Sequence, residues 1–126
     1  MLGLAWLAAL AVHGSPALAQ TGAAAYPSKA ITIVVPFSAG GGVDAVARML
    51  ADKLRASLGQ PVVVDNKPGA GSIVAAQAVL GARPDGHTLL LMSNANAVSV
   101  GLFRKLPYDP QKDFAPVGLI GLFDLA

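Results

Sequence analysis

The 126-residue chain contains no cysteine and no glutamate, and only 13% of its residues are charged. The absence of cysteine excludes a disulfide framework, a thiolate metal site and a cysteine nucleophile. Nine basic and seven acidic residues give a net charge of +2, and they are scattered, so no basic stripe indicates a nucleic-acid partner. Aliphatic residues dominate instead, because 54% of the chain is hydrophobic and its mean hydropathy is +0.58. This composition favours one folded domain, or part of a larger one, over a disordered chain.

The first 28 residues carry no charged side chain. An apolar run over residues 2–12 precedes a break at residues 13–16 and then Ala17-Leu18-Ala19, a small-x-small pattern typical of signal-peptide cleavage. The run is shorter than the roughly 20 residues that a membrane-spanning helix needs. We therefore expect residues 1–19 to be a secretory signal peptide cleaved near Ala19, and residues 20–25 to be a flexible leader.

From Tyr26 onward, short β-branched runs alternate with helical periods. Residues 31–35 are apolar at every position except one threonine, which predicts a strand buried on both faces. The strand stops at Pro36, three glycines follow at residues 40–42, and a helix is predicted to end at Gly59. The apolar positions with helical spacing are Val43, Val46, Ala47, Leu50, Leu54 and Leu58.

The same unit is repeated along the chain. A strand at residues 62–64 leads through a glycine turn at 69–72 into a short helix over 73–80. A third buried strand is predicted over residues 88–92, a helix over 97–103 and a fourth strand over 116–121. Because the chain stops shortly after that last strand, with no further helix to cover the sheet, we expect it to be a fragment.

Three polar or glycine-rich loops follow the first three predicted strands. In a parallel sheet with helical crossovers, the carboxyl ends of all strands lie along one edge. Residues 37–44, 66–73 and 93–97 should therefore line one crevice, which is the candidate functional site.

A dinucleotide-binding fingerprint is the main alternative chemistry for the first loop. Gly40-x-Gly42-x-x-Ala45 follows a strand, and Asp65 closes the next strand about 20 residues further on, as an NAD site requires. However, four residues separate the strand from the first glycine, and Asp44 would face a pyrophosphate with a like charge. We keep an NAD-binding α/β enzyme domain as the alternative, and we prefer a site where backbone N–H groups bind a carboxylate.

Hydrolytic and metal chemistry find little support in the residues. Ser38 and Ser72 do not stand in a G-x-S-x-G motif, and His87 precedes the third strand at the opposite edge of the sheet. We interpret His87 as an ordinary turn residue. Because it has no cysteine or glutamate nearby, we expect no metal site, and no cofactor is predicted.

Two polar clusters have two interpretations each. Asp44 either contacts a ligand or forms a solvated i, i+4, i+8 ladder with Arg48 and Asp52. Asn94 and Asn96 either cap the helix that follows or donate from their amides to a bound carboxylate.

Four blocks of sequence follow one another in a recognisable order. They are residues 26–44, which begin YPSKAITIVVPFSAGGG, residues 60–71 (QPVVVDNKPGAG), residues 84–90 (PDGHTLL) and residues 106–117 (LPYDPQKDFAPV). Together they closely resemble the Bug receptors, the periplasmic substrate-binding proteins of tripartite tricarboxylate transporters.

The resemblance implies an α/β fold: the parallel-sheet lobe of a two-lobed, type II-like periplasmic binding protein, incomplete at the carboxyl end. Residues 26–126 would be the amino-terminal part of the first lobe, with the second lobe absent. It further implies a periplasmic receptor, not an enzyme, that binds a small organic carboxylate and delivers it to a membrane permease. The family's ligand-binding loops fall on Phe37, Ser38, Ala39, Gly40, Gly41, Asp44, Gly69, Ala70, Gly71, Ser72, Ser93, Asn94 and Asn96.

Overall fold

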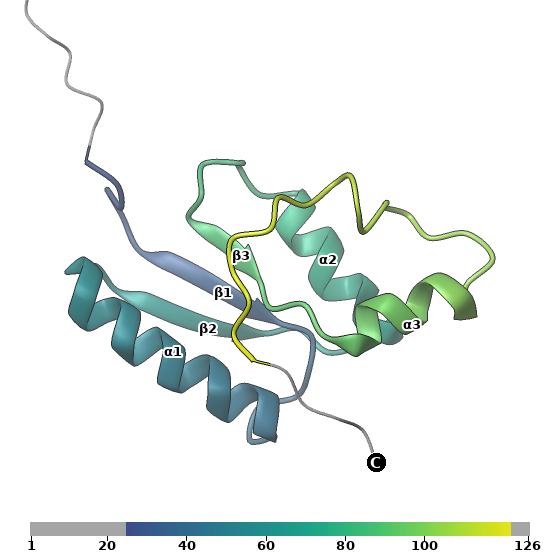
Figure 1. Ribbon diagram of the computed structural model, residues 1–126, viewed down its shortest axis with the longest axis horizontal. Coiled ribbons are helices and arrows are strands. Elements are labelled where there is room, and N and C mark those ends of the chain that lie inside the picture. The colour runs from purple at the N-terminus through teal and green to yellow at the C-terminus, as the bar shows by residue number, and fades with distance from the viewer. Residues whose placement is uncertain (1–24, 122–126) are drawn as a thin grey trace, which may run out of the picture.

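Strand β1 (Ile31–Val35) is the centre of a three-stranded parallel sheet in the computed structural model, which describes residues 25–121. Strand β2 (Val62–Asn66) lies on one side of β1, and strand β3 (Thr88–Leu90) lies on the other (Figure 1). Four of the five β1 residues are buried. The predicted class, an α/β fold with a parallel sheet, is confirmed.

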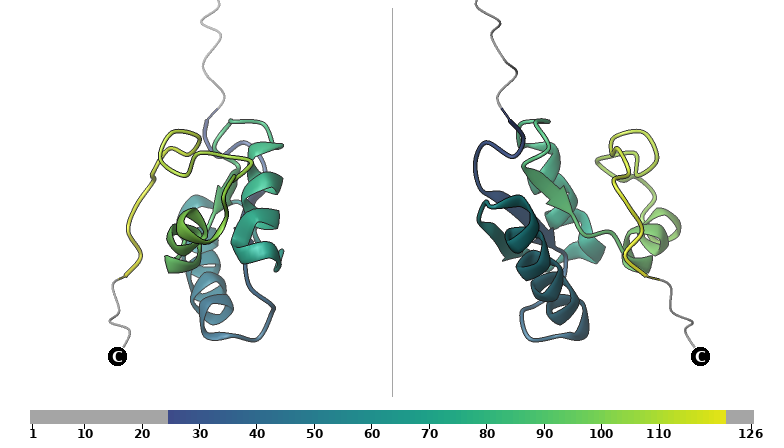
Figure 2. Two further views of the ribbon diagram at one scale, coloured as in Figure 1. Left: turned by 90° about the vertical axis from the view of Figure 1, so that its right-hand side faces the viewer. Right: turned by 60° about the vertical axis from the view of Figure 1, so that its left-hand side comes forward.

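The two helices that connect the strands cover opposite faces of the sheet. Helix α1 (Gly42–Leu58) contacts β1 and β2, whereas helix α2 (Ile73–Leu80) contacts β1 and β3 (Figures 1 and 2). The chain crosses from β1 to β2 in one direction along the sheet and from β2 to β3 in the other. Because both crossovers are right-handed, the two helices lie on opposite faces. The core under α1 consists of Ile31, Ile33, Val35, Ala47, Ala51, Val62 and Leu91.

Helix α1 has nearly the predicted bounds, but one residue of its predicted buried face is exposed. It ends at Gly59, whose N–H donates to the Arg55 carbonyl at 3.1 Å. Val46 was expected on the buried face, but it lies exposed, and Ala51 is in the core instead. At 100° per residue, Val46 falls off the side of the stripe that runs through the other apolar positions.

The third unit differs from its prediction at both ends. Strand β3 stops at Leu90 instead of residue 92, and helix α3 (Asn94–Leu102) begins three residues earlier than expected. The earlier start is explained by side-chain capping, because the Ser93 hydroxyl accepts from the Ala95 N–H and the Asn96 side chain accepts from the Ser93 N–H. A short 3₁₀ turn, η1 (Ala70–Ser72), also precedes α2.

The prediction of a fourth strand over residues 116–121 is wrong. This segment has no regular structure, and Val117 and Leu119 are 84% and 77% exposed. The side views of Figure 2 show it standing away from the sheet. A β-branched, apolar run does not make a strand unless a neighbouring strand accepts its hydrogen bonds, and none of the described strands lies beside it.

Two findings concern the membrane and the amino terminus. Within residues 25–121, no helix is long and apolar enough to cross a membrane. The predicted signal peptide and nearly all of the predicted leader lie outside the described residues.

The core predicts a large difference between two substitutions in neighbouring strands. Ile33→Ala, in the buried centre of β1, should lower the free energy of unfolding by about 2–5 kcal/mol because it leaves a cavity. Val63→Ala, at an exposed position of β2, should lower it by less than about 1 kcal/mol. Urea unfolding followed by circular dichroism measures both. Equal effects would contradict this core.

Candidate functional site

The loops that follow the three strands lie together at the carboxyl edge of the sheet, as predicted (Figure 1). The side-chain amide of Asn66, at the end of β2, donates to the Phe37 carbonyl in the first loop at 3.0 Å. Ser99 of α3 donates to the Gly71 carbonyl in the second loop. Because the strand order is β2-β1-β3, the chain leaves β1 and β2 in opposite directions, and this edge is where α/β sheets bind ligands.

The buried carboxylate of Asp44 holds the first loop in place through hydrogen bonds. One carboxylate oxygen accepts from the Gly40 N–H and from Arg48 Nε, both at 2.9 Å. The other oxygen accepts from the Asn66 amide at 2.9 Å. The residue is only 3% exposed. The Arg48 guanidinium, the Gly40 N–H and the Asn66 amide together hold the pKa of Asp44 well below its ordinary value.

The ladder interpretation of Asp44 is correct for its first pair and wrong for the rest. Asp44 pairs with Arg48 at 2.9 Å, but its carboxylate is buried instead of solvated, and Asp52 pairs with Arg55 at 2.6 Å rather than with Arg48. Asp44 is therefore part of the framework that joins the first loop to the end of β2.

Helices α1 and α2 both begin at this edge without a side-chain cap. The cap position of α1 is Gly41, and that of α2 is Ser72, and neither makes a side-chain capping hydrogen bond. The first N–H groups of a helix have no partner within the helix. Both helices therefore begin at the same edge without a side-chain cap, although the Ile73 N–H, the first of α2, donates to the Ala70 carbonyl. Gly40, Gly41 and Gly42 are exposed at this edge.

The second loop has an unusual backbone. Four consecutive residues, Gly69 to Ser72, have positive φ angles, and two of them are not glycine. Non-glycine residues adopt this conformation only when their surroundings hold them in it. Gly69, Ala70 and Gly71 are exposed, whereas Ser72 is buried and its hydroxyl has no partner among the described residues.

Side chains of the third loop cap helix α3, which follows it. Ser93 Oγ accepts from the Ala95 N–H at 3.2 Å, and Asn96 Oδ1 accepts from the Ser93 N–H at 3.0 Å. The capping interpretation of Asn96 is thus confirmed, while Asn94 is the exposed first residue of α3. The Asn96 nitrogen is buried and has no partner in the described part of the chain.

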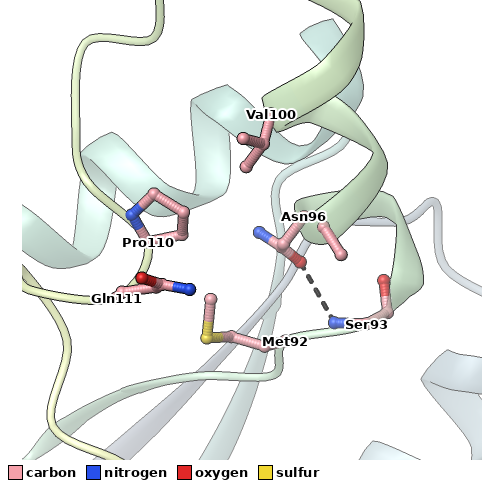
Figure 3. Close-up of a pocket in the computed structure, with 7 residues that line it drawn as sticks. Met92, Ser93, Asn96, Val100, Pro110 and Gln111 are labelled. Carbon is pink, nitrogen blue, oxygen red and sulfur yellow. Dashed lines mark hydrogen bonds between the residues drawn. The ribbon is translucent and has the colours of Figure 1, made fainter.

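A hollow of about 370 Å³ lies between α3 and the segment that follows it. The side-chain nitrogens of Asn96 and Gln111 point into this space from opposite sides (Figure 3). Gln111 was not expected at the site, because no sequence pattern places residues 110–111 against α3. The hollow is lined by Met92, Ser93, Asn96, Ala97, Val100, Pro110 and Gln111.

Ser99 is a functional candidate that the sequence analysis missed, because it acts on a loop 28 residues away and no local pattern specifies such a contact. Arg48 was expected only as the ladder partner of Asp44, and its role in holding the first loop was not predicted. Asn66 lies in the predicted segment 66–73 but was not among the named binding residues.

His87 lies directly before β3, at the edge of the sheet away from the crevice, as predicted. Its Nε2 accepts from the Ser28 N–H at 3.2 Å, and its ring packs at 4.9 Å from the Tyr26 ring. Lys29 pairs with Asp85 at 2.7 Å beside it. These contacts fix the segment that leads into β1. Residues 25–121 contain no group of three or more histidine or carboxylate side chains placed to hold a metal ion.

Comparison with known proteins identifies the family. Residues 46–123 match the tripartite tricarboxylate transporter family receptor. The chain is 43% identical to protein BugT of Bordetella pertussis over 105 residues, which cover 82% of this chain and 32% of that protein. The chain therefore belongs to this receptor family, and its resemblance to the Bug receptors is confirmed.

Solved structures agree with this assignment. The structure of the periplasmic binding protein BugD is 43% identical, with a TM-score of 0.70 over 74% of this chain and 31% of that chain. MatC from Rhodopseudomonas palustris, solved with bound malate, is 45% identical, with a TM-score of 0.70 over 75% of this chain and 33% of that chain. The present chain thus spans about a third of the length of these relatives.

The contacts of Asp44 predict a pH-dependent contribution to stability. Because folding lowers its pKa, the carboxylate stabilises the fold above about pH 4, the ordinary value for aspartate, and this contribution is lost as the pH falls. Asp44→Asn should therefore lower stability clearly at pH 7 and by less at pH 2, because the contribution is lost only as the pH falls through the lowered pKa of the folded carboxylate. Urea unfolding at both values measures this. Asp52→Asn, which removes a single exposed ion pair, is the control and should have little effect at either pH.

Proposed function

We propose that this chain forms the first wall of a periplasmic solute receptor that binds a small organic carboxylate for delivery to a membrane permease. The observation that carries the proposal is that α1 and α2 begin at one edge of the sheet without a side-chain cap, beside the exposed backbone of residues 38–41 and 69–71. Uncapped N–H groups and the positive end of the helix dipole favour an anion. The malate bound to the related MatC is an anion of this class.

The predicted binding residues take distinct parts in this proposal. Exposed backbone of the first loop, at Ser38, Ala39 and Gly41 with Phe37 beside them, and of the second loop, at Gly69 to Gly71, would donate to the carboxylate. Asp44 would act from below by holding Gly40. Ser72, Ser93, Asn94 and Asn96 would shape the rest of the wall.

The NAD alternative has a geometric difficulty at the first loop. The Asp44 carboxylate already occupies the Gly40 N–H, the first donor of the G-x-G-x-x-A pattern. A pyrophosphate bound there would therefore lack the backbone donor that the first glycine of this pattern supplies. Support for the receptor is therefore stronger than support for the nucleotide-binding enzyme.

A substitution at Gly41 tests the carboxylate site without disturbing the fold. Gly41 has a φ of −83°, which any residue adopts, and an added Cβ would meet only the Ser38 carbonyl, at 3.8 Å. Gly41→Val should therefore fold normally, but its side chain should block the backbone N–H groups and weaken carboxylate binding at least about tenfold.

Calorimetry on the complete protein that its gene encodes, with malate and a panel of di-, tri- and aromatic carboxylates, measures this effect. Gly101→Val is the matched control, because a Cβ there meets nothing within 4 Å. Unchanged affinity in Gly41→Val would count against the site. Binding of NAD in place of every carboxylate would establish the alternative.

We further propose export, with cleavage near Ala19, on the basis of the apolar run and the Ala17-Leu18-Ala19 pattern. Amino-terminal sequencing of protein from the periplasm should begin close to Gln20. Protein that begins at Met1, or that is found only in the cytoplasm, would refute this.

A further inference from the structure

Ser99 makes an unusual contact for a serine in the middle of a helix. It is 1% exposed, its hydroxyl donates to the Gly71 carbonyl in the second loop, and it lies 2.8 Å from the Ala95 carbonyl in its own helix. A serine hydroxyl has a single proton. The second loop and helix α3 therefore share one hydrogen-bond donor.

Gly71 is fitted closely against this hydroxyl. A Cβ at Gly71 would lie 2.8 Å from Ser99 Oγ and 3.2 Å from the Phe103 ring. Contact at that distance is tighter than side chains normally make, so glycine is needed to bring the loop backbone against α3. The contact occurs at a left-handed residue, with φ of 60°, between two non-glycine residues in the same conformation.

Other hydrogen bonds hold the loop only locally. The Ser72 N–H donates to the Gly69 carbonyl at 3.1 Å, within the turn itself. The Ser72 hydroxyl, although buried, has no partner in the described residues. Among the side chains of residues 25–121, only Ser99 hydrogen-bonds the backbone of residues 69–72 from outside the turn.

From this geometry we infer that Ser99 is a positioning residue of the carboxylate site. It holds the strained second loop in the shape that presents its backbone to the ligand, and it joins this loop to the self-capped third loop through α3. The inference rests on the proposed function, and Ser99 itself does not touch the ligand, because it is buried beneath the loop.

Ser99→Ala separates positioning from stability. Alanine removes the hydroxyl and favours the helix more than serine does, so the thermal midpoint should change little. The carboxylate affinity should nevertheless fall about threefold to thirtyfold, the range found when a residue acts on a site through its neighbours. Calorimetry with malate and the same carboxylate panel, on the complete protein, measures the affinity. Ser57→Ala, an exposed serine near the end of α1, is the matched control and should leave it unchanged.

Hydrogen exchange gives a second readout that needs no ligand. The N–H groups of Ser72 and Ile73, which close the turn, should exchange faster in Ser99→Ala by a similar factor. The Ala45 N–H, bonded to Gly41 in the first loop at 3.0 Å, should not change.

The outcomes are distinct. Weaker binding together with faster exchange confined to the second loop supports the inference. Unchanged affinity, or weaker binding with unchanged exchange, overturns it, since Ser99 would then act on stability alone or by another route. If the wild type binds no carboxylate, the proposed function is overturned, and the exchange rates still decide whether Ser99 holds the loop.

Discussion

The buried carboxylate of Asp44 is the interaction on which the candidate site depends. A carboxylate this far from water is tolerated only when its oxygens accept several hydrogen bonds, and here a backbone N–H, a guanidinium and an amide supply them. Those donors come from the first loop, from the next turn of α1 and from the end of β2. One side chain therefore fixes the path of the glycine loop and its distance from the neighbouring strand.

The second and third loops are joined in a different way, by close packing of backbone rather than by charge. Gly71 lies against Ser99 and Phe103 of α3, and α3 begins in the third loop. The Asn66 amide then links the first loop to β2. Two side-chain donors, the Asn66 amide and the Ser99 hydroxyl, thus join three loops that are separated by about 30 residues each, and the loops form one edge of the fold.

The regular elements of this fold were predictable from the sequence, whereas its long-range side-chain contacts were not. β-branched runs bounded by glycine and proline indicate β1, β2 and α1 because these signals are local. The partners of Asp44 include Asn66, 22 residues away, and no local pattern specifies such a contact. The prediction of a strand over residues 116–121 was wrong for a related reason. Their composition suits a strand, but a strand forms only beside a neighbouring strand, which composition does not specify.

The three helix N-termini at the crevice differ in a way that favours one kind of ligand. Helix α3 satisfies its first N–H groups with its own serine and asparagine, while α1 and α2 present glycine and a buried, unbonded serine instead. A side-chain cap in place of Gly41 would add only about a few tenths of a kcal/mol to stability, because glycine is itself a tolerated cap residue. The exposed backbone at the start of α1 is therefore open to a ligand anion. The Gly40 N–H is already bonded to Asp44, so the first loop has one donor fewer than a pyrophosphate site of the G-x-G-x-x-A type uses, which favours the smaller carboxylate end of an organic acid.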